Sequence, residues 1–337
     1  MNTGLRITAF AAAIVATFGT AYGVGASIDP VVAEKPPAAH DEHAEAGGEE
    51  AGEKTEDGHG EGHDGGSAEG GAASAAAGGL QMSEGGYTLA LDTPRVAAGK
   101  PATLRFSVKD DDGRSLTSYE REHGKELHFI VASRDLTVYR HLHPTRAADG
   151  TWSVVAEFPA AGGYRAFADF KPARKDATGI TLGTDLAVSG KSEPAALPPV
   201  RATAEVDGYR VTLDGALAPG KARELTLSVS RNGEPVTDLQ PYLGAYGHLV
   251  ALRAGDLAYL HVHPNGEPGD GVTEPGPEVS FTATAPSAGA YRLFLDFQHK
   301  GEVRTAAFTV DVPAAGAGES EESEGGEKGE KGESHGH

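Results

Sequence analysis

One histidine pattern occurs twice in this chain of 337 residues. The first copy reads HFIVASRDLTVYRHLHP over residues 128–144, and the second reads HLVALRAGDLAYLHVHP over residues 248–264. The histidines of the two copies have the same mutual spacing at a constant offset of 120: His128, His141 and His143, then His248, His261 and His263. A pattern repeated once at this distance indicates a duplicated domain rather than a solenoid, which needs at least about three units.

The sequence around the histidines is repeated as well. LRFSV at 104–108 matches LTLSV at 225–229, and GYRAFADF at 163–170 matches AYRLFLDF at 290–297. Each copy consists of short alternating strands broken by Gly, Pro, Asp and Asn, with no helical periodicity. We therefore predict an all-β fold with two tandem Ig-like antiparallel β-sandwich domains, at 82–190 and 203–313, joined by a Pro-rich linker at 191–202.

The two ends of the chain have a different character. Residues 7–28 carry no charge and are long enough for a membrane span, so residues 1–32 are predicted to be an apolar helix that acts as a membrane anchor or a cleaved signal peptide. Either alternative places the remainder outside the cytoplasm, anchored or secreted. The acidic, His-rich stretch 33–81 and the acidic tail 314–337 are predicted to be disordered, because they lack large apolar residues.

Composition excludes several classes of function. The chain has no cysteine, so it has neither disulfides nor a thiolate metal site. Its formal net charge is -20, which argues against nucleic acid as a partner. It also lacks a Gly-rich phosphate loop, a serine nucleophile elbow and a His-Glu-x-x-His motif, so we do not expect an enzyme.

The spacing of the histidines places them on one face of a hairpin. Residues i and i+2 of a strand share a face, so His141 and His143 point the same way. A turn centred on Arg134-Asp135 would put His128 opposite His141, and a turn centred on Ala254-Gly255 would do the same in the second copy. The sequence therefore predicts one three-histidine cluster in each domain.

Such a cluster has the composition of a metal site. Imidazole nitrogens suit Cu(II) or Zn(II), and the two aspartates Asp169 and Asp296 could supply a fourth ligand to each cluster. Alternatively, Asp169 pairs with a nearby arginine or caps a strand end. The histidines could also form a hydrogen-bond network without metal. Metal uptake is expected to weaken as the pH falls, because a protonated imidazole cannot bind an ion.

The full motif resembles a group of bacterial exported domains common in actinobacteria. The resemblance rests on the upstream histidine, the Asp-Leu pair, His-x-His-Pro and the downstream Gly-Tyr-Arg-x-Phe-x-Asp-Phe, and it covers about 82–190 and 203–313. It implies an Ig-like fold and an association with copper or heavy-metal handling. The second copy departs at its turn, which reads Ala-Gly-Asp-Leu, and residues 265–277 carry extra Gly and Pro.

These observations predict a protein that binds metal at the cell envelope. It would buffer or sequester the ion or hand it on, and would contact the membrane only through its N-terminal helix. The alternative is a structural or interaction module of the envelope with no metal.

Overall fold

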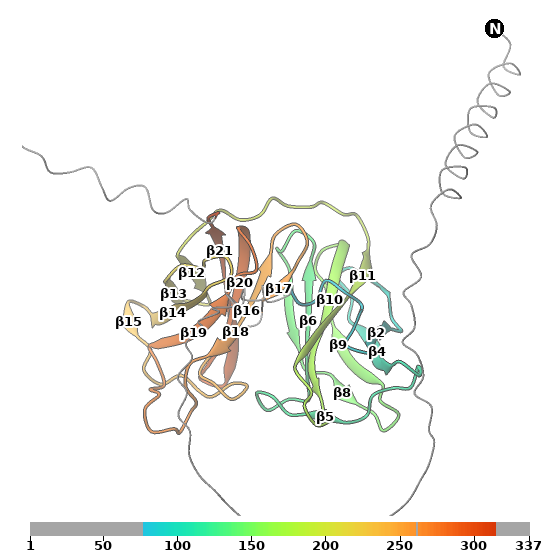
Figure 1. Cartoon of the computed structure of the whole chain (residues 1–337). Helices are drawn as coiled ribbons and strands as arrows, with labels where there is room; N and C mark the ends of the chain where they lie inside the picture. The colour runs from blue at the N-terminus through green and yellow to red at the C-terminus, as the bar shows by residue number, and fades with distance from the viewer. Residues whose placement is uncertain (1–76, 261, 315–337) are drawn as a thin grey trace, which may run out of the picture. The chain divides into compact units, whose positions relative to one another are not determined.

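The structure, a computed structural model, describes residues 77–260 and 262–314, all of whose regular secondary structure is β-strand (Figure 1). No membrane-spanning helix is found among these residues. The predicted N-terminal anchor, residues 33–76 of the predicted linker and the acidic tail from 315 onward lie outside the described residues. Both repeats belong to a single compact unit of the chain.

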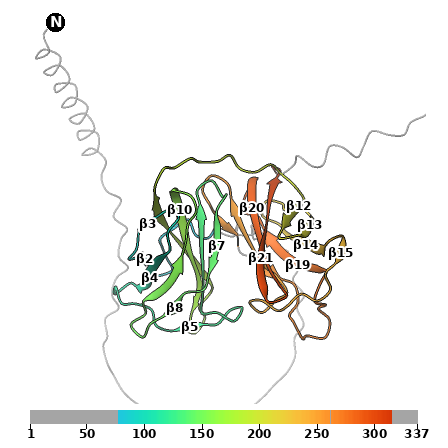
Figure 2. The ribbon, with the colours of Figure 1, turned by 180° about the vertical axis from the view of Figure 1, so that it is seen from behind.

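Repeat 1, residues 82–190, is a sandwich of two sheets. Its strands are β1 (Ser83–Glu84), β2 (Tyr87–Leu91), β3 (Arg95–Ala97), β4 (Ala102–Asp110), β5 (Tyr119–Glu120), β6 (Leu127–Ser133), β7 (Tyr139–Leu142), β8 (Thr145–Arg146), β9 (Trp152–Ala156), β10 (Gly162–Pro172) and β11 (Ile180–Ser189). One sheet has the order β1-β2-β4-β9-β8, and the other has the order β3-β11-β10-β6-β7, with β5 paired to β10. Figure 2 shows β3 and β7 at opposite edges of the second sheet.

Repeat 2, residues 203–313, has the same plan. Its strands are β12 (Thr203–Val206), β13 (Tyr209–Asp214), β14 (Ala222–Arg231), β15 (Glu234–Pro235), β16 (His248–Arg253), β17 (Tyr259–Leu260), β18 (Val262–Pro264), β19 (Glu278–Thr284), β20 (Gly289–His299) and β21 (Glu302–Val312). The sheets are β12-β13-β14-β19-β18, with β15 on β14, and β17-β16-β20-β21.

This strand order is that of the immunoglobulin fold, as predicted. In repeat 1, β2, β4, β9 and β8 correspond to strands A, B, E and D, while β11, β10, β6 and β7 correspond to G, F, C and C′. Both repeats also contain the tyrosine corner of that fold at the start of strand F. Tyr164 donates a hydrogen bond to the Ala160 carbonyl at 2.7 Å, and Tyr291 donates to the Ser287 carbonyl at 2.8 Å.

Each sandwich encloses its own apolar core. Repeat 1 buries Leu89, Phe106, Phe129 and Trp152 between its sheets, and repeat 2 buries a matching set that includes Leu227, Phe281 and Phe308. A parallel stack of Phe106 on Phe129, with ring centroids 4.2 Å apart, joins strands B and C across the first core. These cores take the place of the disulfide that antibody domains use.

A third apolar cluster joins the two repeats. It contains Ile130, Ala132, Leu136, Tyr139 and Phe167 from repeat 1, with Val250, Leu252, Leu257, Tyr259 and Phe294 from repeat 2. The contacts are reciprocal, because Tyr139 stacks on Phe294 at 4.1 Å and Tyr259 lies against Phe167 at 5.7 Å. Strands β6 and β16 are therefore covered on both faces, by the core of their own sandwich and by the other repeat, and every residue of β6 is buried.

The hairpin that carries the histidines has a different register from the predicted one. Ile130, not His128, pairs with His141, and in repeat 2 Ala251 pairs with Leu260. The turn is centred one residue later than expected, on Asp135-Leu136, because the Asp135 carboxylate accepts hydrogen bonds from Ser133 Oγ at 2.6 Å and the Thr137 amide at 3.1 Å. The partner of His141 is thus two positions along β6 from the predicted one. Because side chains alternate between faces, His128 and His141 still share a face.

Residues Gly78–Gln81, which the sequence assigns to the disordered linker, are ordered. The Gly79 amide donates to the Thr181 carbonyl at 2.8 Å, and the Gly183 amide donates to the Gln81 carbonyl at 2.8 Å. The Tyr259 amide of repeat 2 donates to the Gly78 carbonyl at 2.9 Å. This strap, as we call residues 78–81, thus lies along β11 and also contacts the other repeat.

Candidate metal centre

Three imidazoles from the two repeats meet where the repeats join. His128 lies on β6, His141 on β7 and His248 at the start of β16. One ring nitrogen from each lies within 4.8 Å of the others, close enough for one metal ion after small side-chain movements. Among the described residues this cluster spans both repeats, whereas the sequence predicts one cluster inside each.

The register of strand F places an acidic residue beside each upstream histidine. Asp169 on β10 pairs directly with His128, and Asp296 on β20 pairs directly with His248. Directly opposed residues share a face, so each aspartate faces the same side of its sheet as the histidine. The strand carrying each aspartate therefore lies beside the histidine hairpin, as a ligand role for either residue requires.

The hydrogen-bond partners of two rings fix where their protons lie. His128 Nε2 lies 3.3 Å from the Glu122 carbonyl oxygen, which can only accept, so Nε2 carries the hydrogen and Nδ1 a lone pair. His141 Nδ1 lies 2.8 Å from Asp296 Oδ2 and donates to it, so the neutral ring has a lone pair on Nε2. These two nitrogens, His128 Nδ1 and His141 Nε2, are 3.1 Å apart. Two lone pairs facing each other at this distance repel unless a cation or a proton lies between them.

Asp296 orients a histidine of the other repeat. Both side chains are almost fully buried, with 3 % of His141 and 2 % of Asp296 exposed. The other carboxylate oxygen accepts a hydrogen bond from Thr305 Oγ1 at 2.5 Å. A metal-binding histidine typically donates its second ring N–H to a carboxylate or carbonyl in this way. Asp296 therefore bonds to His141 through one oxygen and to Thr305 through the other, and its role as a fourth ligand stays a prediction.

Two further ring nitrogens at the cluster are buried without a hydrogen-bond partner. They are Nδ1 of His248 and Nε2 of His143. The His143 ring lies 4.9 Å from that of His141, and the His248 ring lies 4.7 Å from it, both measured between centroids. A buried polar atom without a partner is unfavourable, and coordination of a metal ion would satisfy a nitrogen lone pair in this position.

Burial favours the neutral form of three rings of the cluster, those of His128, His143 and His248. It lowers the pKa of His128 to about 3, with the neighbouring His141 adding to the effect. The pKa of His143 falls to about 4 for the same two reasons. The pKa of His248 lies well below its usual value, through burial first and then through His141 and His128. Neutral imidazole is the form that binds metal.

Two tight turns border the cluster. In each repeat a turn with two left-handed residues precedes strand C, at His123-Gly124 and at Leu243-Gly244. The His123 ring lies 6.2 Å from the rings of both His128 and His248. Tyr242, before the second turn, lies 6.0 Å from the His143 ring. The sequence pattern gives no reason to include His123, which we interpret there as incidental because the second copy has Leu243 in its place.

A pocket of about 280 Å³ opens beside His128 and His123. Glu120, Glu122, Glu126, Asp169 and Glu267 line it together with Lys125 and Lys171. Two of these acids are paired, Glu120 with Lys171 at 2.6 Å and Glu126 with Arg146 at 3.1 Å. The pocket is therefore an acidic approach to the ring of His128, which suits a cation.

The remaining predicted ligands have different positions. Asp169 accepts a hydrogen bond from Thr181 Oγ1 at 2.8 Å, as Asp296 does from Thr305. His261 lies outside the described residues. His263 belongs to β18, where its backbone pairs with Thr282, and a ligand role for its side chain stays a prediction.

A family model described as a domain of unknown function, DUF8832, matches residues 81–182 and 204–314. The chain belongs to this family. The two matched stretches make up more than half of the chain and take in both histidine motifs. The DUF8832 description assigns no activity, and no curated protein matches the sequence.

Three solved structures show distant likeness to this DUF8832 protein. The Escherichia coli adhesin FdeC is 15% identical over 69% of this chain and 65% of its own, with a TM-score of 0.22. A Salmonella alpha-2-macroglobulin is 12% identical over 69% of this chain and 15% of its own, with a TM-score of 0.23. A marsupial T cell receptor is 12% identical over 68% of this chain and 96% of its own, with a TM-score of 0.21. The Ig-like assignment therefore rests on strand order, not on these matches.

Proposed function

We propose that this protein binds one divalent transition-metal ion, Cu(II) or Zn(II), between its two repeats. His128, His141 and His248 would be the ligands, with His143 placed to complete a fourth position. The role is binding, in which the protein buffers the ion or hands it on, rather than catalysis. One shared site replaces the two separate sites that the sequence predicts.

The observation that carries the proposal is the pair of opposed lone pairs on His128 and His141. Two nitrogens bound to one tetrahedral ion at about 2.0–2.1 Å lie about 3.3 Å from each other. The distance between His128 Nδ1 and His141 Nε2 is 3.1 Å, close to that value. The outer nitrogens of both rings already donate to oxygen acceptors, as a ligand pair requires.

The donor set supports the choice of metal. Three or four imidazoles without thiolate suit Cu(II) or Zn(II), whereas Ca(II) and Mg(II) prefer oxygen ligands. A site outside the cytoplasm is supported by the uncharged stretch at residues 7–28, which suits an anchor or a signal.

A second candidate is a metal-free clasp between the repeats. The same geometry allows His141 to carry protons on both nitrogens, so that it donates to Asp296 and to His128 at once. The repeats would then be joined by an imidazolium, and the protein would be a structural module of the envelope. This alternative leaves Nδ1 of His248 and Nε2 of His143 unpartnered.

Metal titration of the full chain, without added histidine tags, separates the two candidates. A chromophoric chelator present as competitor removes ions held only by the scattered histidines of the chain ends. We expect one ion per chain to resist the chelator, and the variant His128→Ala/His141→Ala to retain none while keeping the far-UV spectrum of the native protein. Two equally tight ions per chain, or one ion retained by the variant, would contradict the shared site. No retained ion, together with an NMR signature of imidazolium at His141, would favour the clasp.

A further inference from the structure

The duplication makes it possible to compare one arginine in two settings. Arg165 on β10 and Arg292 on β20 occupy the same place in the two repeats, since Arg165 pairs with Asp185 and Arg292 with Thr309 on the neighbouring strand. In both repeats Nη1 bonds to that neighbour, at 3.1 Å to Asp185 Oδ1 and at 3.0 Å to Thr309 Oγ1. The remaining guanidinium N–H groups have different surroundings.

In repeat 1 the strap covers the guanidinium. Arg165 Nε donates to the Gly79 carbonyl at 2.7 Å, and Nη2 donates to the Leu80 carbonyl at 2.8 Å and the Gly183 carbonyl at 3.1 Å. Every nitrogen of Arg165 therefore has an oxygen acceptor. The strap comes this close because position 183 is glycine: a Cβ there would lie 2.0 Å from the Gly79 carbonyl oxygen.

In repeat 2 no such strap fits. The residue at the place of Gly183 is Ala307, since Gly183 pairs with Phe167 and Ala307 pairs with Phe294. The Ala307 methyl group occupies the position that a strap carbonyl would need. Arg292 Nε is buried with no partner, and within the described part of the chain no carboxylate forms an ion pair with this guanidinium. A half-buried guanidinium whose Nε–H has no acceptor is unfavourable, so a ligand that supplies oxygen would be stabilised here.

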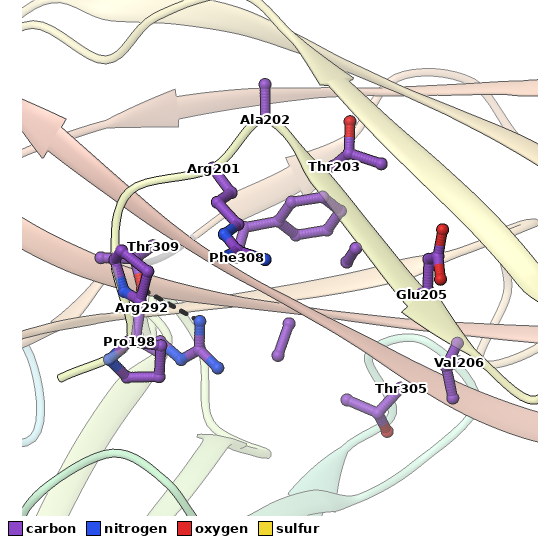
Figure 3. Close-up of a pocket in the computed structure, with 13 residues that line it drawn as sticks. Pro198, Arg201, Ala202, Thr203, Glu205, Val206, Arg292, Thr305, Phe308 and Thr309 are labelled. Carbon is purple, nitrogen blue, oxygen red and sulfur yellow. Dashed lines mark hydrogen bonds between the residues drawn. The ribbon is translucent and has the colours of Figure 1, made fainter. Parts of the chain in front are cut away.

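A groove of about 850 Å³ is lined by Arg292 and Ala307, the counterparts of the two residues that the strap contacts in repeat 1 (Figure 3). It runs between the linker, β12 and β21, and its polar lining consists of Arg201, Thr203, Glu205, Arg292, Thr305 and Thr309. Glu205 is already paired with Arg210 at 2.9 Å, so it does not neutralise the two arginines of the groove. The groove therefore offers two guanidinium groups and the hydroxyls of Thr203 and Thr309 to a ligand, whereas the Thr305 hydroxyl already donates to Asp296.

We propose that this groove binds a carboxylate through Arg292 and Arg201. A carboxylate offers two oxygens to a guanidinium and makes the strongest hydrogen bonds that arginine forms with organic ligands. It can come from a small free acid or from the glutamates that follow β21 in this chain. The segment 315–337 begins three residues after β21 ends at Val312, and it holds seven glutamates and two lysines.

Succinate is a suitable probe, and the Arg292 Nε–H signal in ¹⁵N NMR spectra of the full, metal-free chain is a suitable readout. We expect a saturable shift of this signal and of the Thr309 amide. Arg292→Gln should weaken succinate binding, measured from the saturation of the Thr309 amide shift, by about tenfold or more, because a charge-assisted hydrogen bond is lost. Arg165→Gln, the matched change in repeat 1, should leave succinate binding unchanged. Arg292→Lys keeps the charge but lacks the planar guanidinium group. It takes the place of Arg292→Gln if that variant does not fold.

A second full-length variant, with Glu319, Glu321, Glu322 and Glu324 replaced by glutamine, distinguishes the two sources of carboxylate. Tighter succinate binding in this variant than in the native chain would show that the chain's own glutamates compete for the groove. Equal binding would assign the groove to a free acid. Absence of a saturable shift in both proteins, or an equal response in Arg292→Gln, would overturn the proposal.

Discussion

Two buried histidines in this protein lie against carboxylates, yet their surroundings differ. His299 in repeat 2 has both ring nitrogens partnered, Nδ1 with the Tyr209 hydroxyl at 2.7 Å and Nε2 with Asp238 at 2.9 Å. His141 has one nitrogen on Asp296 and the other facing a lone pair of His128. A histidine whose nitrogens are all satisfied serves packing, whereas a group of rings with unsatisfied nitrogens can hold an ion. The number of ring nitrogens with a hydrogen-bond partner, not the His–Asp contact, distinguishes the two arrangements.

Replacing each histidine by alanine tests this difference most directly. His141→Ala should weaken metal binding by on the order of 100-fold or more, because a ligand is removed, and loss of an outer partner alone costs about 10–100-fold. His299→Ala should leave metal affinity unchanged but lower the free energy of unfolding by about 1–3 kcal/mol, because it leaves the buried Tyr209 hydroxyl without its partner. Chelator competition and urea unfolding measure the two effects. Similar losses of metal affinity in both variants would remove the distinction.

The two aspartates provide a subtler comparison. Asp296→Asn should reduce metal affinity by about 10–100-fold, because the carboxylate fixes the His141 ring and makes it more basic. Asp238→Asn, beside His299, should not change metal affinity and should alter stability by less than about 1 kcal/mol, since 74 % of the Asp238 side chain is exposed. The same chelator assay applies. An unchanged affinity in Asp296→Asn would mean that this carboxylate does not act on a ligand.

The pH dependence that His128 and His143 contribute to metal binding should be the smallest effect. Two ordinary imidazoles with a pKa near 6.5 would weaken binding by on the order of 1,000-fold between pH 7.5 and pH 5. With pKa values of about 3 for His128 and about 4 for His143, these two rings should contribute less than about twofold over the same range. Affinity measured at pH 7.5, 6 and 5 tests this expectation. A steep loss near pH 6.5 attributable to these rings would show that they are exposed to solvent.

The same lowered pKa values affect folding in the metal-free protein. Below about pH 6.5 the unfolded chain takes up protons on these histidines that the native state does not, so the unfolded state binds more protons and stability falls as the pH falls. The decline continues down to the folded pKa values and is absent above about pH 7.5. The His128→Ala/His141→Ala variant should show a shallower decline in urea midpoints over this range.

Much of the candidate site follows from local pattern. The alternation of side chains along a strand places His128, His141 and His143 on one face, and an error of two positions in the register preserves that face. The exact pairing could not be predicted, because it depends on the Asp135 side chain holding the turn and on Leu136 adopting a left-handed backbone with φ of 57°. Leucine rarely adopts that conformation, so nothing in the sequence pattern indicates it.

Strand β6 carries a sequence signal for the meeting of the two repeats. It reads LHFIVAS, and it is apolar at almost every position rather than at alternate ones. A continuous apolar run indicates a strand buried on both faces, which in a two-sheet sandwich requires a further layer. That layer is the other repeat, as the contacts of Ile130 and Val250 show.

The sequence alone determined the duplication, the all-β sandwich and the presence of imidazoles on a shared strand face, because these depend on spacing within one hairpin and its repeat. Only the tertiary structure decided that His141 and His128 of one repeat share a centre with His248 and Asp296 of the other. That arrangement depends on burying apolar side chains between two sheets that lie about a hundred residues apart in the chain. Side-chain alternation specifies which face is apolar, but the partner of that face is chosen by packing between domains.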